Sequence, residues 1–427
     1  MGSAGRSAPA RRWGAPDVAC AASARLRESI GEAAAALIAR LAPVSLAVLL
    51  ILCSFGCAGG GESGTFVGDR LSALNTRSRP VTMRVPTRTR AHPGVGIDIA
   101  AHTFAGDRSS HIVFVHGLLA DSRTWRLVVE ELETDSTVTL VDLPGCGESD
   151  APNPHEVGDD VYSPYEMGER VLLALRASLA TMPEDGRLTL VGHSLGGAVV
   201  IRCLCDPSLS GRFGDVVARV DRAVLFSPLD VVMERPIDSL RALADADALT
   251  IDIANLTGVL SERIRESFPR GSTFDTGLIE EETRGLVATL SSTNRRLGAQ
   301  AMLRAATAWD KNMRPDWVKM EGVASMYANL RQPVLILWGS RDEVLPVSMG
   351  YKLATQFVNA HFLVLNGRSH APQIESPGDC ARAIDRFVAT GAIPELPGTD
   401  APIRRMTDRL RAAGTSDGAP ASGEAGG

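Results

Sequence analysis

Short runs of apolar residues recur along the middle of the chain, with stretches of helical character between them. Uniformly apolar runs are typical of parallel strands that are buried on both faces. The pattern predicts strands over residues 81–85, 96–104, 111–116, 137–141, 188–191, 223–226, 334–338 and 362–365. Strands that alternate with helices form βαβ units, so we expect an α/β fold with a mostly parallel sheet flanked by helices.

One interval in this pattern is far longer than a crossover connection requires. Residues 227–333 separate two consecutive predicted strands, whereas a crossover with its helix needs only about a dozen residues or somewhat more. The interval reads as helical, for instance over residues 280–310, where leucines such as Leu286 and Leu290 recur among polar residues. We therefore expect an inserted helical cap.

The two ends of the chain differ in composition from this middle part. After about residue 393, Pro, Gly, Ala, Ser and charged residues dominate, which is typical of a disordered tail. The expected organisation is a signal or lipobox-like segment with a linker (1–79), the first part of an α/β core (80–228), the cap (229–331), the second part of the core (332–393) and the tail (394–427).

The N-terminal segment has the features of an export signal. Its first 56 residues carry a net positive charge, and the apolar stretch 44–55 is short for a membrane-spanning helix but suits the apolar region of a signal peptide. Residues 54–57 resemble a bacterial lipobox, in which the cysteine, here Cys57, becomes lipidated. Three interpretations stay open: a lipoprotein at the cell envelope or membrane, an ordinary signal or uncleaved anchor, or a start assigned too early in a cytoplasmic protein.

Composition and charge narrow the class of protein. The chain contains 44 Lys and Arg against 50 Asp and Glu, a net charge of −6, which argues against a protein that coats nucleic acid phosphates. Hydrophobic residues make up 44% and charged residues 22%, as in soluble globular enzymes. Seven cysteines are too few for a disulfide scaffold, and none form the paired spacing of a zinc site.

The most informative motif is Gly192-His193-Ser194-Leu195-Gly196, which lies between an apolar strand and an apolar helix. A G-x-S-x-G sequence in this setting is typical of a nucleophile elbow, a strained strand-to-helix turn that needs small neighbours. The helix that follows directs its N-terminal amides and its positive dipole end toward the serine. Ser194 is therefore the predicted nucleophile.

A serine nucleophile requires an oriented base, so a histidine and a carboxylate must come from elsewhere. His370 follows the last predicted strand in a glycine-containing loop and is the predicted base. Asp342 follows the preceding strand and is the predicted acid that orients it. Asp230, after the strand 223–226, is the alternative acid, and Glu343 is a more distant one.

The loop after the strand 111–116 can supply one half of an oxyanion hole. The backbone amide of Leu118 would act together with that of Leu195, the residue after the nucleophile. Gly117 indicates a backbone shaped for close approach, so we expect His116 to be a hydrogen-bonded loop residue rather than a base. His193, beside the nucleophile, is also expected to be structural.

Residues 81–390 resemble the α/β-hydrolase superfamily, in its cap-bearing subset. Ser194, Asp342 and His370 stand in that family's order, and residues 142–149 are similar to its D-x-P-G-x-G-x-S turn, which we interpret as a fold-specifying element. Members of the family that open epoxides or remove halide carry Asp at the elbow, so Ser194 argues against both of these activities.

The resemblance implies a serine hydrolase that cleaves a small-molecule ester or related acyl substrate through an acyl-enzyme. The sequence contains no metal or nucleotide motif, so no cofactor is implied. Two alternatives remain. One is a carbon–carbon bond hydrolase that uses the same triad, and the other is a catalytically silent, hydrolase-like binding protein.

The lipobox interpretation predicts membrane attachment that depends on Cys57. Wild-type protein should fractionate with membranes and begin at Cys57 with acyl chains attached, because each buried methylene contributes about 0.8 kcal/mol and several chains hold a protein firmly. Cys57→Ala should abolish the acylated mass. Cell fractionation with intact-mass measurement checks this, and a soluble wild-type protein or one that retains residues 1–56 would contradict it.

Overall fold

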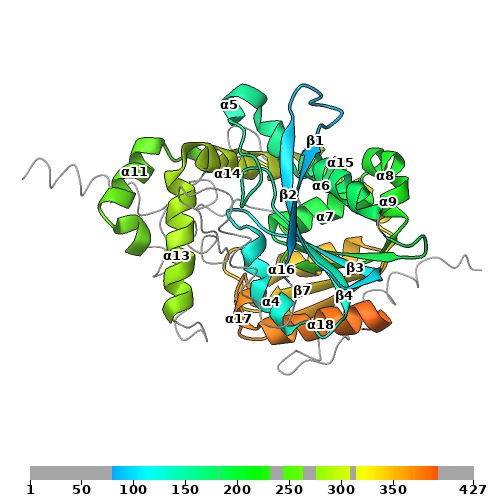
Figure 1. The fold of residues 1–427 in the computed structure, drawn as a ribbon. Coiled ribbons are helices and arrows are strands. Elements are labelled where there is room, and N and C mark those ends of the chain that lie inside the picture. Colours follow the sequence, from blue (N-terminus) through cyan, green and yellow to red (C-terminus); the bar gives the residue numbers. More distant parts are fainter. Residues whose placement is uncertain (1–78, 181, 231–243, 263–275, 308–313, 393–427) are drawn as a thin grey trace, which may run out of the picture. The chain divides into compact units, whose positions relative to one another are not determined.

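The computed structural model describes residues 79–180, 182–230, 244–262, 276–307 and 314–392, all within the unit Val44–Gly427. An eight-stranded sheet has the order β1-β2-β4-β3-β5-β6-β7-β8 (Figure 1). The pairs β1–β2 and β2–β4 are antiparallel, and the remaining pairs are parallel. The strands are β1 Val81–Thr87, β2 Ile97–Phe104, β3 Asp107–Val115, β4 Ser136–Val141, β5 Arg187–His193, β6 Val220–Phe226, β7 Val334–Gly339 and β8 Ala360–Leu365. The predicted α/β fold is confirmed.

Alternate residues of the central strands supply two separate hydrophobic cores, one on each face of the sheet. On β3, Val113 and Val115 belong to one core, whereas Ile112 and Phe114 belong to the other. Because neighbouring side chains point to opposite faces, a strand covered on both sides must be apolar throughout. The uniform apolar runs of the sequence are explained by this double burial.

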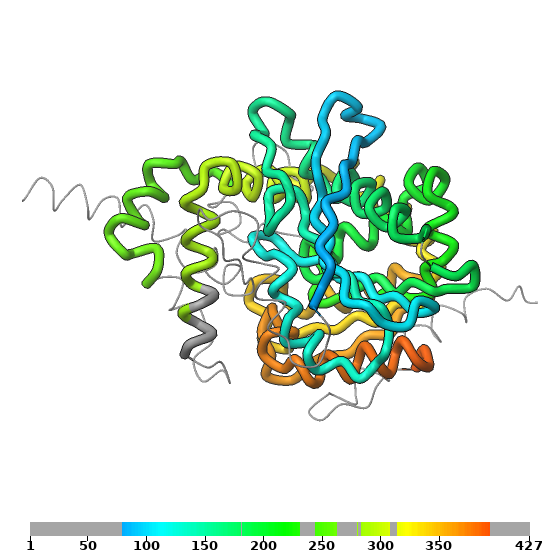
Figure 2. Tube along the Cα trace, in the orientation of Figure 1, coloured from blue at the N-terminus to red at the C-terminus, as the bar shows by residue number. Residues whose placement is uncertain are grey.

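Helices cover both faces of the sheet. One core is closed by α6 (Pro164–Leu179), α7 (Leu195–Cys205) and α16 (Val347–Gln356), and the other by α4 (Arg126–Glu131) and α18 (Pro377–Thr390). Figure 2 shows α18, in orange, running along its side of the sheet with the cyan α4 beside it.

Local signals in the sequence set the ends of these helices. The side chain of Ser163 accepts a hydrogen bond from the amide of Glu166, and Pro164 occupies the first turn of α6. The helix α18 ends at Gly391, whose φ of 67° is left-handed and whose amide donates to the carbonyl of Phe387.

The long interval between β6 and β7 contains helices, as the sequence indicates. Its described elements are α11 (Ala248–Leu256), α13 (Thr276–Ser291), α14 (Thr293–Ala306), α15 (Trp317–Met326) and the 3₁₀ turn η3 (Tyr327–Asn329). The helix α14 attaches this insertion to the core: Arg295 donates to the carbonyl of Gly147 over 2.7 Å, and Arg304 pairs with Asp159. All of these elements lie within the residues expected for the cap.

Four cysteines lie in the described part of the chain, and all four are buried free thiols: Cys146, Cys203, Cys205 and Cys380. Burial raises the pKa of Cys205 to about 12 and raises the pKa of the other three thiols as well.

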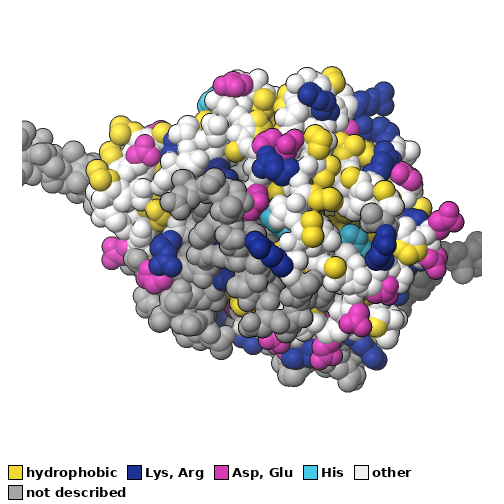
Figure 3. Space-filling view, viewed as in Figure 1, with side chains coloured by type: hydrophobic (Ala, Val, Ile, Leu, Met, Phe, Trp, Pro, Cys, Tyr) yellow, Lys and Arg dark blue, Asp and Glu magenta, His cyan; other side chains and the backbone are white. Residues whose placement is uncertain are grey.

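Acidic and basic side chains are interspersed over the face of the molecule shown in Figure 3.

The signal and lipobox-like segment with Cys57, and the tail 394–427, lie outside the described residues. Within the described ranges, no helix combines the length and apolarity needed to cross a membrane.

Gly339, at the end of β7, tests how closely the backbone of this strand packs against the loop that precedes His370. A Cβ atom at this position would lie 2.0 Å from the carbonyl oxygen of Ser369. Gly339→Ala should therefore lower the free energy of unfolding by about 1–3 kcal/mol, because the backbone must shift to admit the methyl group. Urea denaturation measures this change.

Gly322 is the matched control, because it lies in the exposed interior of α15, where a Cβ would meet nothing within 4 Å. Gly322→Ala should raise the free energy of unfolding by about 0.5–1 kcal/mol. Equal destabilisation by both substitutions would contradict the packing argument.

Candidate active site

Ser194 occupies a strained turn between β5 and α7. Its backbone has φ 49° and ψ −116°, a conformation that costs energy for a residue with a Cβ atom. Two hydrogen bonds to β6 and the residues after it fix this turn. The amide of Ser194 donates to the carbonyl of Phe226 over 2.9 Å, and the carbonyl of Ser194 accepts from the amide of Leu229 over 2.9 Å. The sharp turn expected of a nucleophile elbow is therefore present at Ser194.

The glycines around Ser194 are required by close contacts between backbone segments. A Cβ on Gly192 would lie 2.6 Å from the carbonyl oxygen of Gly196. A Cβ on Gly196 would lie 2.3 Å from the carbonyl oxygens of both Val115 and His116. The first turn of α7 therefore lies directly against the end of β3.

His370 and Asp342 are brought together by the loops that follow β8 and β7. The Nδ1 atom of His370 lies 2.7 Å from Oδ2 of Asp342, and both side chains are buried. The other carboxylate oxygen, Oδ1, accepts hydrogen bonds from the amides of Val344 and Leu345 over 3.0 and 2.7 Å. The carboxylate is thus held by its own loop and places the proton of the imidazole on Nδ1, which leaves Nε2 as the basic nitrogen.

His193 connects the serine turn to the histidine loop. Its Nε2 donates to the carbonyl oxygen of His370 over 2.9 Å, and the two rings lie 5.0 Å apart. Burial and the nearby ring of His370 hold the pKa of His193 well below its usual value, so this side chain is neutral. His193 therefore has the structural role expected for it, because its hydrogen bond links the end of β5, directly before Ser194, to the loop that carries His370.

The histidine loop has a second support in Glu375, which belongs to none of the sequence motifs described above. Its carboxylate oxygens accept from the amide of Ser369 over 3.0 and 3.1 Å, and also from the Ser369 hydroxyl. Burial raises the pKa of Glu375. Glu375 thereby fixes the residue that precedes His370.

Asp230, the alternative acid, has a different partner. Its carboxylate forms a buried ion pair with Arg202 of α7, with 3.1 Å between Nη1 and Oδ2. Burial opposes the charge of Arg202, but the neighbouring carboxylate outweighs burial and raises the pKa of Arg202. Glu343 is exposed. Of the three carboxylates that the sequence offers, Asp342 is the one hydrogen-bonded to His370.

The two predicted oxyanion amides come from segments that contact each other. Leu195 is the first residue of α7, and Leu118 lies in the loop after β3, against which α7 begins. His116 stabilises this loop, since its Nδ1 lies 2.8 Å from the carbonyl oxygen of Gly117 and its Nε2 accepts from the amide of Leu143 over 2.9 Å. His116 is thus a hydrogen-bonded loop residue.

Comparison with known proteins agrees with this geometry. The sequence matches the family described as the alpha/beta hydrolase family over residues 112–383. The chain belongs to this family. The chain is 26% identical over 282 residues to an uncharacterized protein of Mycobacterium tuberculosis, covering 65% of this chain and 75% of that protein.

Another relative of this alpha/beta hydrolase is an esterase. The chain is 25% identical over 299 residues to the pimeloyl-acyl-carrier protein methyl ester esterase of Edwardsiella ictaluri, covering 66% of this chain and 94% of that protein. A solved structure of a thermophilic esterase from Thermogutta terrifontis superposes with a TM-score of 0.51 at 20% identity, covering 73% of this chain and 98% of the other. Membership of this hydrolase family and the esterase relative support a hydrolase enzyme over a silent binding protein.

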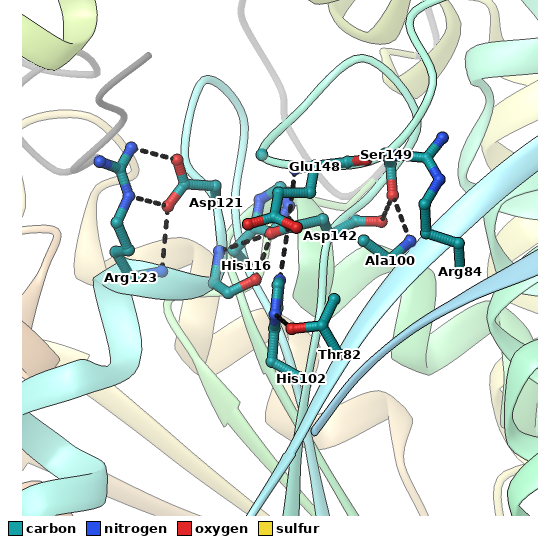
Figure 4. A network of polar contacts seen from close by, with 12 residues as sticks. Thr82, Arg84, Ala100, His102, His116, Asp121, Arg123, Asp142, Glu148 and Ser149 are labelled. Carbon is teal, nitrogen blue, oxygen red and sulfur yellow. Dashed lines mark hydrogen bonds and ion pairs between the residues drawn. The ribbon is translucent and has the colours of Figure 1, made fainter. Parts of the chain in front are cut away.

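Asp142 of the hydrolase organises the turn that follows β4 (Figure 4). Its buried carboxylate accepts from the amide of Ser122 over 2.8 Å and from the amide of Glu148 over 2.8 Å. A Cβ on Gly147 would lie 2.1 Å from this carboxylate, which explains the glycine at that position, where φ is 49°. The D-x-P-G-x-G-x-S motif therefore builds a packed turn around Asp142.

Within the described ranges, no group of three or more His, Cys, Asp or Glu side chains is arranged to hold a metal ion.

Proposed function

We propose that this alpha/beta hydrolase is a serine hydrolase that cleaves an ester or a related acyl substrate through an acyl-enzyme on Ser194. The observation that carries the proposal is the buried 2.7 Å hydrogen bond between His370 and Asp342. His193 ties this pair to the strained turn that bears Ser194. Three loops after parallel strands thus supply a nucleophile, a base and an orienting acid.

The chemistry follows from these roles. The Oγ atom of Ser194 attacks the carbonyl carbon while Nε2 of His370 takes the hydroxyl proton, and a tetrahedral oxyanion forms. Asp342 stabilises the imidazolium, which then gives its proton to the departing alcohol as the carbon–oxygen bond breaks. A water molecule, deprotonated by His370, attacks the acyl-enzyme, and the acid product leaves when Ser194 regains its proton.

Backbone amides stabilise the charge that develops on the carbonyl oxygen. The amide of Leu195 belongs to the first turn of α7, where amides lack helical acceptors and the helix dipole is positive. The amide of Leu118 is the second donor in the proposal. Donors fixed before the reaction act mainly on the transition state, so they raise kcat.

We also propose that the hydrolase works outside the cytoplasm, attached through the N-terminal segment with Cys57. The basic lead, the apolar stretch 44–55 and the lipobox-like residues 54–57 support this placement. A lipid anchor would hold the catalytic domain close to a membrane surface, and the Cys57→Ala fractionation described above tests it.

The assignment of nucleophile and base predicts that two single substitutions have the same effect. Ser194→Ala and His370→Ala should each lower turnover of a chromogenic acyl ester by about 10⁴-fold or more, and the double variant should be hardly worse, because triad members act as a unit. Labelling with a fluorophosphonate should be lost in Ser194→Ala. Ser227→Ala is a suitable control, because Ser227 also has a positive φ, 39°, directly after a neighbouring strand.

Near-normal turnover in either folded triad variant would contradict the assignment. A wild-type protein that takes the label on Ser194, is inactive on esters of graded chain length and cleaves a vinylogous diketone would favour the carbon–carbon bond hydrolase.

The choice of acid predicts opposite effects of two Asp→Asn substitutions. Asp342→Asn should lower turnover by about 10³–10⁴-fold in a folded protein, because an amide neither stabilises the imidazolium nor enforces the tautomer. Asp230→Asn should instead lower the free energy of unfolding by about 3 kcal/mol, because it leaves Arg202 charged and buried. Steady-state kinetics and urea denaturation of both variants separate the effects, and exchanged results would assign the acid to Asp230.

A further inference from the structure

We infer that His102 is a positioning residue of this hydrolase, which acts through Asp142 to hold the loop that carries the Leu118 amide. The inference rests on the proposed function, since it assigns the Leu118 amide to the oxyanion hole. His102 lies on β2, outside every sequence motif that led to the active site.

His102 bridges two strands and the buried carboxylate (Figure 4). Its Nε2 lies 3.1 Å from Oδ2 of Asp142, and its Nδ1 lies 2.8 Å from the hydroxyl of Thr82 on β1. The side chains of His102 and Asp142 are both fully buried. A carboxylate taken out of water in this way needs partners for both of its oxygens.

The carboxylate of Asp142 divides its oxygens between different segments. Its Oδ1 accepts from the amide of Ser122 over 2.8 Å and also from the Ser122 hydroxyl. Its Oδ2 accepts from the amide of Glu148 over 2.8 Å and contacts His102. His102 is therefore the group that faces the carboxylate from the sheet, while Ser122 faces it from the loop that contains Leu118.

That loop is anchored at both ends to residues that follow β4. At its start, the Nε2 atom of His116 accepts from the amide of Leu143 over 2.9 Å. At its far end, Ser122 is held by Asp142. Between the anchors, Leu119 has a φ of 61°, a strained value for a leucine, so the anchors must maintain the shape of the loop.

The directions of the pKa shifts of His102 and Asp142 agree with a carboxylate that His102 helps to keep ionised. Burial opposes the charge of His102, but its hydrogen bond with Asp142 and the carboxylates of Asp142, Glu148 and Asp121 raise the pKa of His102. Burial likewise opposes the charge of Asp142, yet its contacts with His102, His116 and Ser122 hold its pKa well below the usual range. Ser122 thus faces an ionised acceptor, which makes the stronger hydrogen bond.

Loss of His102 would leave Oδ2 of Asp142, an oxygen of a fully buried side chain, with one fewer partner. The carboxylate would then move or take up a proton, and either change weakens its hold on Ser122. A small displacement of the Leu118 amide would reduce its bond to the oxyanion in the transition state while substrate binding stays unchanged. The signature is a lower kcat at constant KM.

The experiment compares three variants on an ester and on its thionoester, in which sulfur replaces the carbonyl oxygen and accepts hydrogen bonds weakly. His102→Phe removes both hydrogen bonds of the imidazole, whereas the amide of His102→Gln can still donate to Asp142. His111→Phe is the matched control: His111 is also buried, and its Nε2 lies 2.8 Å from the hydroxyl of Thr139, away from Asp142.

His102→Phe should lower kcat for the ester by about 10²-fold with KM within about twofold, and lower the thionoester rate only a few-fold, because the oxyanion contact matters less there. His102→Gln should recover most of the ester rate. His111→Phe should keep kcat within about twofold of wild type, since it leaves the oxyanion loop intact.

Three outcomes would overturn the inference: equal kcat for His102→Phe and His111→Phe, equal losses on ester and thionoester, or no recovery in His102→Gln. If His102→Phe does not fold, Ser122→Ala takes its place, with a selective loss on the ester expected and an equal loss on both substrates contradicting the inference. A wild-type protein that cleaves no ester would overturn the proposed function itself, whereas an active wild type with an unaffected His102→Phe would overturn the inference alone.

Discussion

The contact between the first turn of α7 and the end of β3 is the constraint on which the candidate site depends. Gly196 approaches the carbonyls of Val115 and His116 so closely that no side chain fits between them. This approach sets the start of α7, with Leu195, against the end of β3, which leads into the loop that carries Leu118, and Ser194 precedes the helix in a strained backbone conformation. The hydrogen bonds to Phe226 and Leu229 hold that strain within the sheet.

Much of the fold could be predicted because double burial leaves a simple signature. Strands such as β7 are apolar at every position, and they appear in the sequence at nearly the residues the structure gives them. The order of Ser194, Asp342 and His370 along the chain could also be predicted, since each lies shortly after the end of an apolar strand. The sequence predicts Asp342 as the acid and keeps Asp230 as the alternative. The ion pair between Asp230 and Arg202 could not be predicted, because the two residues meet only after α7 packs beside β6.

His102 shows a second limit of sequence reasoning. A polar residue in a strand normally indicates a side chain that faces solvent, yet His102 is fully buried, whereas the other polar residues of β2, Asp98 and Thr103, are only half-buried. Its partner Asp142 stands 40 residues later, and no local spacing connects the two. Long-range polar pairs of this kind become visible only when the register between β2 and β4 is known.

The buried thiols have a consequence for where such a catalytic domain can survive. Thiol exchange requires a thiolate that can reach another sulfur, and the four described cysteines are both covered by packing and held protonated by their raised pKa values. Once folded, this domain keeps its cysteines out of reach of oxidants and foldases. The fold of the described residues therefore depends on no disulfide among these four cysteines.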